Sequence, residues 1–133
     1  MRLAVSFDPE RGERMSLLAQ ILVGVVAVLH AWFLVLEMFL WSTPYGRRAF
    51  GQTAEQAEAT RVLAANQGLY NGFLAAGLLW GLVQGAPGRG VVVFFLGCVI
   101  VAGLYGGISA SRKVLLVQAL PGVVALVAWL AAG

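Results

Sequence analysis

The sequence predicts an all-α integral membrane protein, folded as an up-down bundle of four helices. Three observations lead to this fold class. Hydrophobic residues make up 60% of the 133 residues and charged residues only 11%, too few to cover the surface of a soluble domain. Four apolar runs each approach the ~20 residues that a helix needs to cross a bilayer. Short connections between the later runs place successive helices antiparallel to one another.

The chain divides into a short polar segment and one membrane domain. Residues 1–14 are rich in charge and predict a polar N-terminal tail, while residues 15–133 predict the four-helix transmembrane domain. Met15 is an alternative start, because the membrane pattern begins there. Backbone groups in lipid must form hydrogen bonds within their own segment, so each apolar run is expected to be helical. The expected spans are about 17–41, 60–83, 90–110 and 113–132.

Each span has recognisable ends. The first run is too long for a signal-peptide core, and Pro44 with Gly46 ends it. A long connection, residues 42–61, follows. Within it, Thr53 and Gln56 form a capping-box pattern, so the second helix begins near Thr53. The remaining connections, QGAPGRG and SRK, are tight turns.

The basic residues near the span ends predict the orientation. Cytoplasmic connections of membrane proteins carry an excess of lysine and arginine. We therefore expect the connections after the first and third spans to lie in the cytoplasm, with both termini outside, in a bacterial inner membrane. The residues that carry this signal are Arg47, Arg48, Arg61, Arg112 and Lys113.

Small residues recur four positions apart in the second and third spans. Gly68, Gly72 and Ala76 form one such series, and Gly103 and Gly107 form another. This spacing lets helix backbones approach closely in a membrane. It is compatible with packing inside one chain and with a homo-oligomer through the glycine-rich faces.

Polar side chains collect in the cytoplasmic half of the predicted bundle. Counted inward from the helix ends at 1.5 Å per residue, they form a layer roughly 6–9 Å deep and a second layer about one turn deeper. Together they predict a polar pocket that is open on one side. Its expected members are His30, Glu37, Asn66, Gln67, Tyr70, Asn71, Tyr105 and Gln118.

Glu37 is the residue that most strongly indicates function. It is the only acidic residue in the long apolar runs, and carboxylates inside a membrane are costly and usually mark a site. The leading hypothesis is an acid–base enzyme, an isomerase or an epoxide-opening enzyme, that acts on a small lipophilic molecule. Glu37 would move a proton, His30 would be its partner or relay, and Tyr70 would help orient the substrate. The expected substrate-binding residues are Asn66, Gln67, Asn71, Tyr105 and Gln118.

Other interpretations stay open at this point. The polar side chains can instead hold the helices together, with His30 donating to a backbone carbonyl. Glu37 could exchange a proton in a proton-coupled small-molecule transporter, or the protein could be a non-catalytic scaffold that binds lipid or a partner. An exchanger needs access from both faces, and the outer half has no polar lining besides Gln20. This asymmetry favours an enzyme or a binder.

The composition predicts neither a cofactor nor a metal site. One histidine, one intramembrane glutamate and the single Cys98 cannot complete a metal shell. The basic residues lie in short connections, where they indicate topology and phosphate contacts, so no nucleic-acid partner is expected. The expected partners are membrane lipid and a small lipophilic molecule.

Several sequence blocks resemble a known family. LHAWFLVLEMFLW, TPYGRRAFG and ANQGLYNGFLAAGLLWG, followed by YGG and VQALPG, are similar to a family of small membrane proteins catalogued as domain of unknown function 1304. The resemblance covers about residues 15–133. It implies a four-span membrane protein and brings no established reaction with it.

Overall fold

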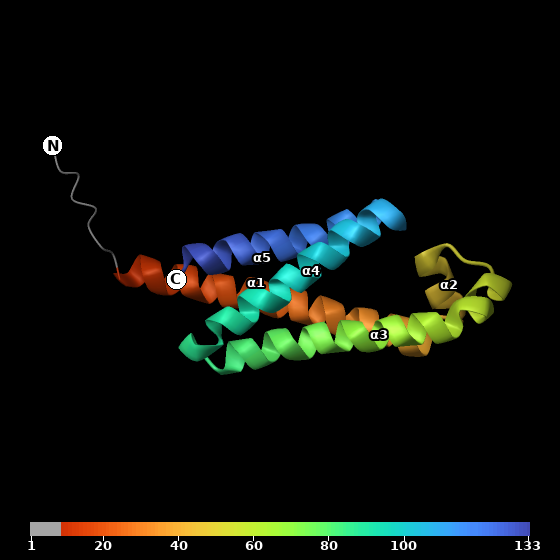
Figure 1. Ribbon diagram of the computed structural model, residues 1–133, viewed down its shortest axis with the longest axis horizontal. Coiled ribbons are helices and arrows are strands. Elements are labelled where there is room, and N and C mark those ends of the chain that lie inside the picture. The colour runs from red at the N-terminus through yellow and green to blue at the C-terminus, as the bar shows by residue number, and fades with distance from the viewer. Residues whose placement is uncertain (1–8) are drawn as a thin grey trace.

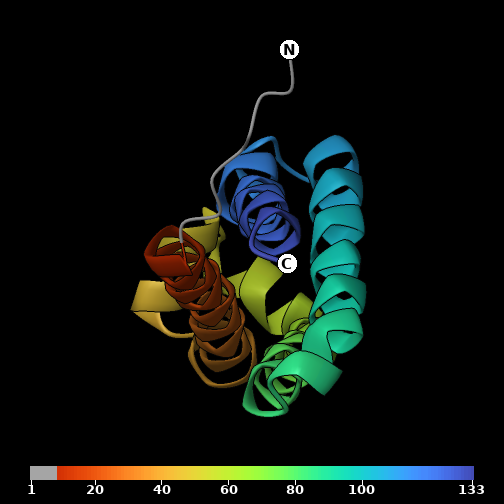
Figure 2. The ribbon, with the colours of Figure 1, turned by 90° about the vertical axis from the view of Figure 1, so that its left-hand side faces the viewer.

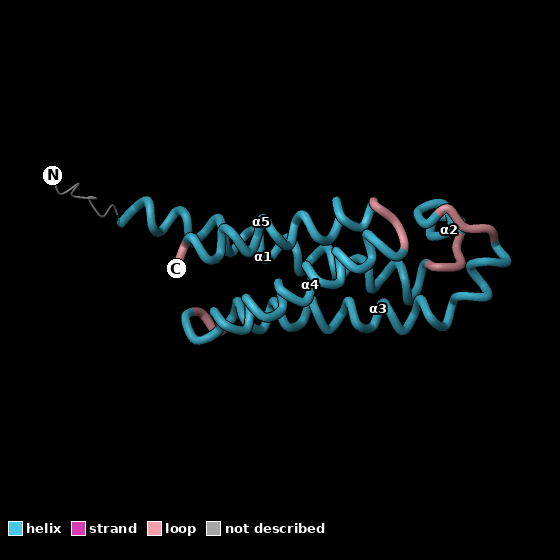
Figure 3. Tube along the Cα trace, turned by 45° about the horizontal axis from the view of Figure 1, so that its top comes forward, coloured by secondary structure: helices cyan, strands magenta, loops and turns pink. Residues whose placement is uncertain are grey.

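A computed structural model of the protein describes residues 9–133, with side chains for residue 10 and residues 16–133. Within this range all regular structure is helical, which confirms the all-α prediction. Loops lie in the connections and at the C-terminus (Figure 3). Residues 1–8 of the predicted N-terminal tail lie outside the described residues. The rest of the predicted tail belongs to the first helix, which begins at Pro9.

Two of the long helical stretches contain a π-helical turn, in which the backbone hydrogen bonds reach back five residues instead of four. One follows the first helix directly, and the other leads into the last helix. In chain order the elements are α1 (Pro9–Val35), a π turn (Leu36–Leu40), α2 (Pro44–Phe50), α3 (Ala54–Val83), a 3₁₀ turn (Ala86–Gly88), α4 (Arg89–Ser109), a second π turn (Leu115–Ala119) and α5 (Leu120–Ala131).

The four long helices pack around a common centre. Helix α1 contacts α3 and α5, and α4 also contacts α3 and α5. Successive long helices run in alternating directions (Figure 1), and Figure 2 shows the same four helices from one end. One end of the molecule holds the C-terminus and the connection between α3 and α4. The other end holds α2 and the connection between α4 and α5.

The capping box predicted at the start of α3 is confirmed. Gln56 N donates to Thr53 Oγ1 at 3.1 Å, and Thr53 N donates to Gln56 Oε1 at 3.0 Å. These reciprocal bonds satisfy two donors that the first turn of a helix leaves free. The helix therefore begins at Ala54, several residues before the expected span at 60–83.

Helix α2 is not expected from the sequence, which predicts a connection over residues 42–61. Thr43 caps it by accepting a hydrogen bond from Gly46 N at 3.2 Å, and Pro44 occupies its first position. A Cβ atom at Gly46 would collide with the Leu40 carbonyl group. Only glycine therefore allows α2 to fold back so closely over the π turn after α1.

An apolar core closes the end of the molecule that holds the C-terminus. Val23 and Val26 from α1, Leu78 from α3 and Leu96 from α4 are all fully or almost fully buried there. Trp129 of α5 packs against the same cluster. The Arg89 guanidinium donates to the Trp129 carbonyl oxygen at 2.9 Å and lies 5.1 Å from the indole ring.

The recurring glycines face neighbours within the same chain. A Cβ atom at Gly68 would lie 2.8 Å from Met38 Cγ and 3.0 Å from Glu37 Cβ. A Cβ atom at Gly103 would lie 2.6 Å from the backbone nitrogen of Ala119. Each π turn thus rests against a glycine of the neighbouring helix. A homo-oligomer through these faces stays a prediction.

Large apolar side chains lie exposed along all four long helices. Val28 of α1 is 68% exposed and Ile108 of α4 is 86% exposed. Two helical stretches, Ser16–Leu40 and Ala86–Ser109, are long and apolar enough to cross a membrane. Leu115–Ala131 is also apolar but shorter. Helix α3 does not meet the same criterion, since it carries several polar and charged side chains.

Candidate functional site

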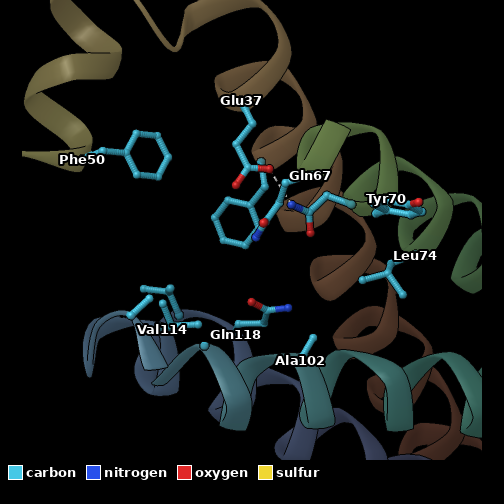
Figure 4. Close-up of a pocket in the computed structure, with 13 residues that line it drawn as sticks. Glu37, Phe50, Gln67, Tyr70, Leu74, Ala102, Val114 and Gln118 are labelled. Atoms are coloured by element: carbon cyan, nitrogen blue, oxygen red, sulfur yellow. Dashed lines mark hydrogen bonds between the residues drawn. The ribbon is translucent and has the colours of Figure 1, made fainter. Parts of the chain in front are cut away.

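A cavity of about 300 Å³ lies between the helices in the half of the molecule that contains α2. Its volume is at the lower end of the range for small-molecule sites. Apolar side chains such as Phe33, Phe50 and Leu74 form most of the wall. A few polar groups from α3 and from the two π turns interrupt that wall (Figure 4).

Glu37 and Asn71 form the central polar contact of this cavity. Asn71 Nδ2 donates to Glu37 Oε2 at 2.7 Å, which joins the π turn after α1 to the middle of α3. Asn71 is only 8% exposed, so its amide is held in place by packing. A single neutral donor holds one oxygen of Glu37, and the carboxyl group remains part of the cavity wall.

Two glutamine side chains approach the same space from opposite walls. Gln67 projects from α3, and Gln118 projects from the π turn before α5 (Figure 4). Neither side chain has a hydrogen-bond partner among the described residues. Amides at these positions can donate to, and accept from, a ligand that enters between them.

The π turns explain how Glu37 and Gln118 come to line the cavity. Glu37 is the second residue of one turn, and Gln118 is the fourth residue of the other. In the second turn, Leu120 N–H bonds to the Leu115 carbonyl group five residues earlier. Pro121 has no N–H group and cannot donate the α-helical hydrogen bond to the Val117 carbonyl group, so the regular hydrogen-bond pattern is interrupted there in any case. Such turns occur frequently at functional sites.

The structure brings five of the eight predicted site residues to this cavity: Glu37, Gln67, Tyr70, Asn71 and Gln118. Tyr70 contributes its ring at the edge, and its hydroxyl group points away from Glu37 (Figure 4). Asn66 and Tyr105 do not line the cavity. Tyr105 is 74% exposed on the outer face of α4, where it borders a separate apolar hollow.

His30 is fully buried and does not line the cavity. Its Nδ1 donates to the Val26 carbonyl oxygen at 2.8 Å, one turn earlier in α1. Its ring meets Phe33 edge to face, with 5.4 Å between the ring centres. Nε2 is buried without a hydrogen-bond partner among the described residues. The bond to Val26 fits the structural interpretation of this histidine, in which its ring donates to a backbone carbonyl group.

Sequence reasoning misses the apolar part of the site. Phe50 reaches the cavity only because α2 folds back over the end of the bundle of helices, and the sequence does not predict α2. Phe33 belongs, by its sequence pattern, to the general core rather than to a ligand wall. The Thr43-Pro44 pair, a capping residue followed by proline at the first helical position, is the signal that could have revealed α2.

Comparison with known proteins finds relatives without an assigned activity. The family model described as "Protein of unknown function (DUF1304)" matches residues 24–130, a range that includes all the cavity-lining residues. The "Uncharacterized protein YpaA" of Lactococcus lactis subsp. lactis is 30% identical over 115 residues, which cover 85% of this chain and 97% of YpaA. No solved structure matches the chain.

Proposed function

The chain belongs to the DUF1304 family, and from the site that its fold builds we propose a membrane enzyme that carries out acid–base chemistry on a small lipophilic molecule. The observation that carries this proposal is the Glu37 carboxyl group, bonded at 2.7 Å to Asn71 inside a largely apolar cavity. Burying a carboxyl group costs free energy, so a carboxyl group retained in such surroundings usually marks a functional site.

The outer surface supports the membrane part of the proposal. Soluble monomers rarely expose large continuous apolar patches, yet exposed valine, leucine and isoleucine side chains follow every long helix of this protein. In a bilayer these side chains would face lipid. The four long helices would then cross the membrane as an up-down bundle, with the polar cavity near the end that carries α2.

The chemistry follows from the groups at the cavity wall. In an isomerisation, the Glu37 carboxylate takes a proton from a carbon beside a carbonyl group or double bond. The carboxylic acid that results returns the proton to a second carbon, so the carboxylate is regenerated. Gln67 and Gln118 would donate hydrogen bonds to the substrate oxygen on which negative charge develops. Asn71 would hold Glu37 in place.

The packing of the opposite half argues against transport across the membrane. There the core around Val23, Leu78 and Leu96 is fully buried and contains no polar lining. A substrate that enters beside α2 therefore finds no second polar opening. This arrangement favours an enzyme or a binder with one entrance over a proton-coupled exchanger.

Hydrogen exchange from heavy water tests for catalysis even while the substrate is unidentified. The purified protein in phosphatidylcholine nanodiscs is incubated in D₂O with lipids extracted from cells that naturally produce it. We expect at least one lipophilic compound to gain deuterium or to convert into an isomer, as detected by mass spectrometry. Empty nanodiscs are the control. If folded protein leaves all compounds unchanged, the acid–base enzyme is refuted, and the transporter and the scaffold remain.

Cysteine labelling tests the membrane assignment and the orientation. In a protein whose Cys98 is replaced by alanine, a cysteine at Arg112 should be shielded from an impermeant maleimide in intact cells. A cysteine added after Gly133 should react. A cysteine at Val28, although 68% exposed on the isolated protein, should react only after denaturation in SDS, because lipid would cover it.

Each outcome of the labelling experiment has one meaning. Reaction at Arg112 and protection after Gly133 would reverse the orientation and place the cavity at the outer face. Rapid reaction at Val28 in native membranes would contradict the membrane assignment itself. Labelling of all three positions in SDS confirms that each thiol is present and reduced.

A further inference from the structure

A second cavity of about 420 Å³ adjoins the first one. The two cavities share the side chains of Phe33, Phe50, Val114 and Val117, so an apolar wall runs from one into the other. The second cavity continues toward the end of the molecule, where α2 and the connection between α4 and α5 border it. Glu37 lines only the first cavity, whereas Arg48 and Lys113 line only the second.

The second cavity is bordered by basic side chains. Arg48 from α2 and Lys113 from the connection before α5 both line the second cavity, together with Ser111. The described residues provide neither cation with a carboxylate partner, whereas Arg61 pairs with Glu58 at 3.3 Å. Two unpaired cations from different elements therefore border the second cavity, and Glu37 borders the first, with apolar side chains shared between them.

We propose that the ligand of this site is a single-chain anionic amphiphile. Its carboxylate or phosphate oxygens bind Arg48 and Lys113, and its apolar chain lies along the four shared side chains. Its reacting portion reaches Glu37 and Asn71. This assignment rests on the proposed function, to which it adds the chemical class and the orientation of the substrate.

Physical reasons favour this orientation of the ligand. The guanidinium group of arginine matches the geometry of carboxylate and phosphate oxygens, and the lysine ammonium group adds a point charge. The opposite orientation would place the anionic group beside Glu37, where like charges repel. A neutral or cationic amphiphile would leave the two basic groups without a partner in the bound state.

Photo-crosslinking measures the preference directly. Protein in phosphatidylcholine nanodiscs is crosslinked to dodecanoate that carries a diazirine near the end of its chain. Unlabelled dodecanoate, dodecyl phosphate, dodecanol and dodecylamine then compete with this probe. We expect the crosslinks to map to Glu37 or Phe33, and dodecanoate or dodecyl phosphate to displace the probe at about tenfold lower concentration than dodecanol.

The double variant Arg48→Gln/Lys113→Gln isolates the role of the two cations. Each competitor partitions into lipid to the same extent whichever variant is present. We therefore compare, between parent and variant, the ratio of the dodecanol concentration to the dodecanoate concentration that displaces the probe. We expect the ratio to fall about tenfold in the double variant, while displacement by dodecanol stays unchanged. Arg112→Gln removes a neighbouring charge that borders neither cavity and should leave the ratio as in the parent.

The outcomes separate this inference from the proposed function. If the ratio of displacing concentrations is the same in parent and double variant, the ligand is not recognised by its anionic group. That result overturns the anionic ligand but leaves a lipophilic site intact. Loss of the preference when phosphatidylglycerol is added to the nanodiscs assigns the cations to bilayer phospholipid, and also overturns it. No specific crosslinking in folded parent protein refutes the lipophilic site and the proposed function together.

Discussion

Replacement of Glu37 by glutamine is expected to abolish turnover and to leave the fold intact. Glutamine has the shape of glutamate, and its side-chain oxygen can still accept the hydrogen bond that Asn71 donates to Glu37 at 2.7 Å. It cannot exchange a proton. General acid–base catalysis contributes roughly 10²–10⁴-fold to a rate, so the rate of deuterium incorporation should fall by at least about 100-fold.

The control for this variant is Glu58→Gln. Glu58 lies on the exposed start of α3, where it pairs with Arg61 and borders neither cavity. It should retain the parent rate, and both variants should melt within a few degrees of the parent in dodecyl maltoside. Full activity in folded Glu37→Gln protein would refute the acid–base enzyme and the proton-coupled exchanger alike. An inactive variant that still binds dodecanoate would identify an enzyme.

A large loss of stability is expected for Gly103→Ala. The added methyl group would lie 2.6 Å from the backbone nitrogen of Ala119 and 2.8 Å from its Cα atom. Backbone atoms cannot move aside as the end of a side chain can, so α4 and the π turn before α5 must separate. Overpacking of this kind costs about 1–3 kcal/mol, and we expect the upper part of that range.

Gly97→Ala is the matched control, because it makes the same change in the same helix. A Cβ atom at Gly97 meets nothing within 4 Å. This variant should melt at or slightly above the temperature of the parent, since alanine favours a helix over glycine. Thermal unfolding in dodecyl maltoside, followed by circular dichroism, compares the two. Equal melting temperatures for both variants would show that the contact between Gly103 and Ala119 is not needed.

Depth along the helices can be predicted from the sequence, whereas rotation about them cannot. Counting residues inward places five residues in one layer: Glu37, Asn66, Gln67, Tyr105 and Gln118. Three of these five line the cavity. Asn66 and Tyr105 do not, because neighbouring residues on a helix point about 100° apart. In a helix that is apolar on every side, no pattern indicates which face is inward.

The glycines show a similar limit. Their spacing predicts the same close helix packing at Gly72 and at Gly103. The atoms that face the two glycines differ, however. A Cβ atom at Gly72 would meet the flexible end of the Leu34 side chain, whereas one at Gly103 would meet backbone. The capping box at Thr53 is predictable because every atom that forms it belongs to one local segment. Contacts between distant segments have no such local signature.

The π turns make the site depend on the number of residues as well as on their identity. A regular helix would span the same height as each π turn with one residue fewer. Deletion of a single residue from Leu36–Leu40 would therefore let the chain continue as an ordinary α-helix with the following residues in place, but it would change where the side chains inside the turn point, Glu37 among them. The sequence could keep its glutamate, its hydrophobicity and its helical fold, and still lose the alignment of that glutamate with Asn71. When related chains are aligned, a one-residue gap here is thus a larger functional difference than many substitutions.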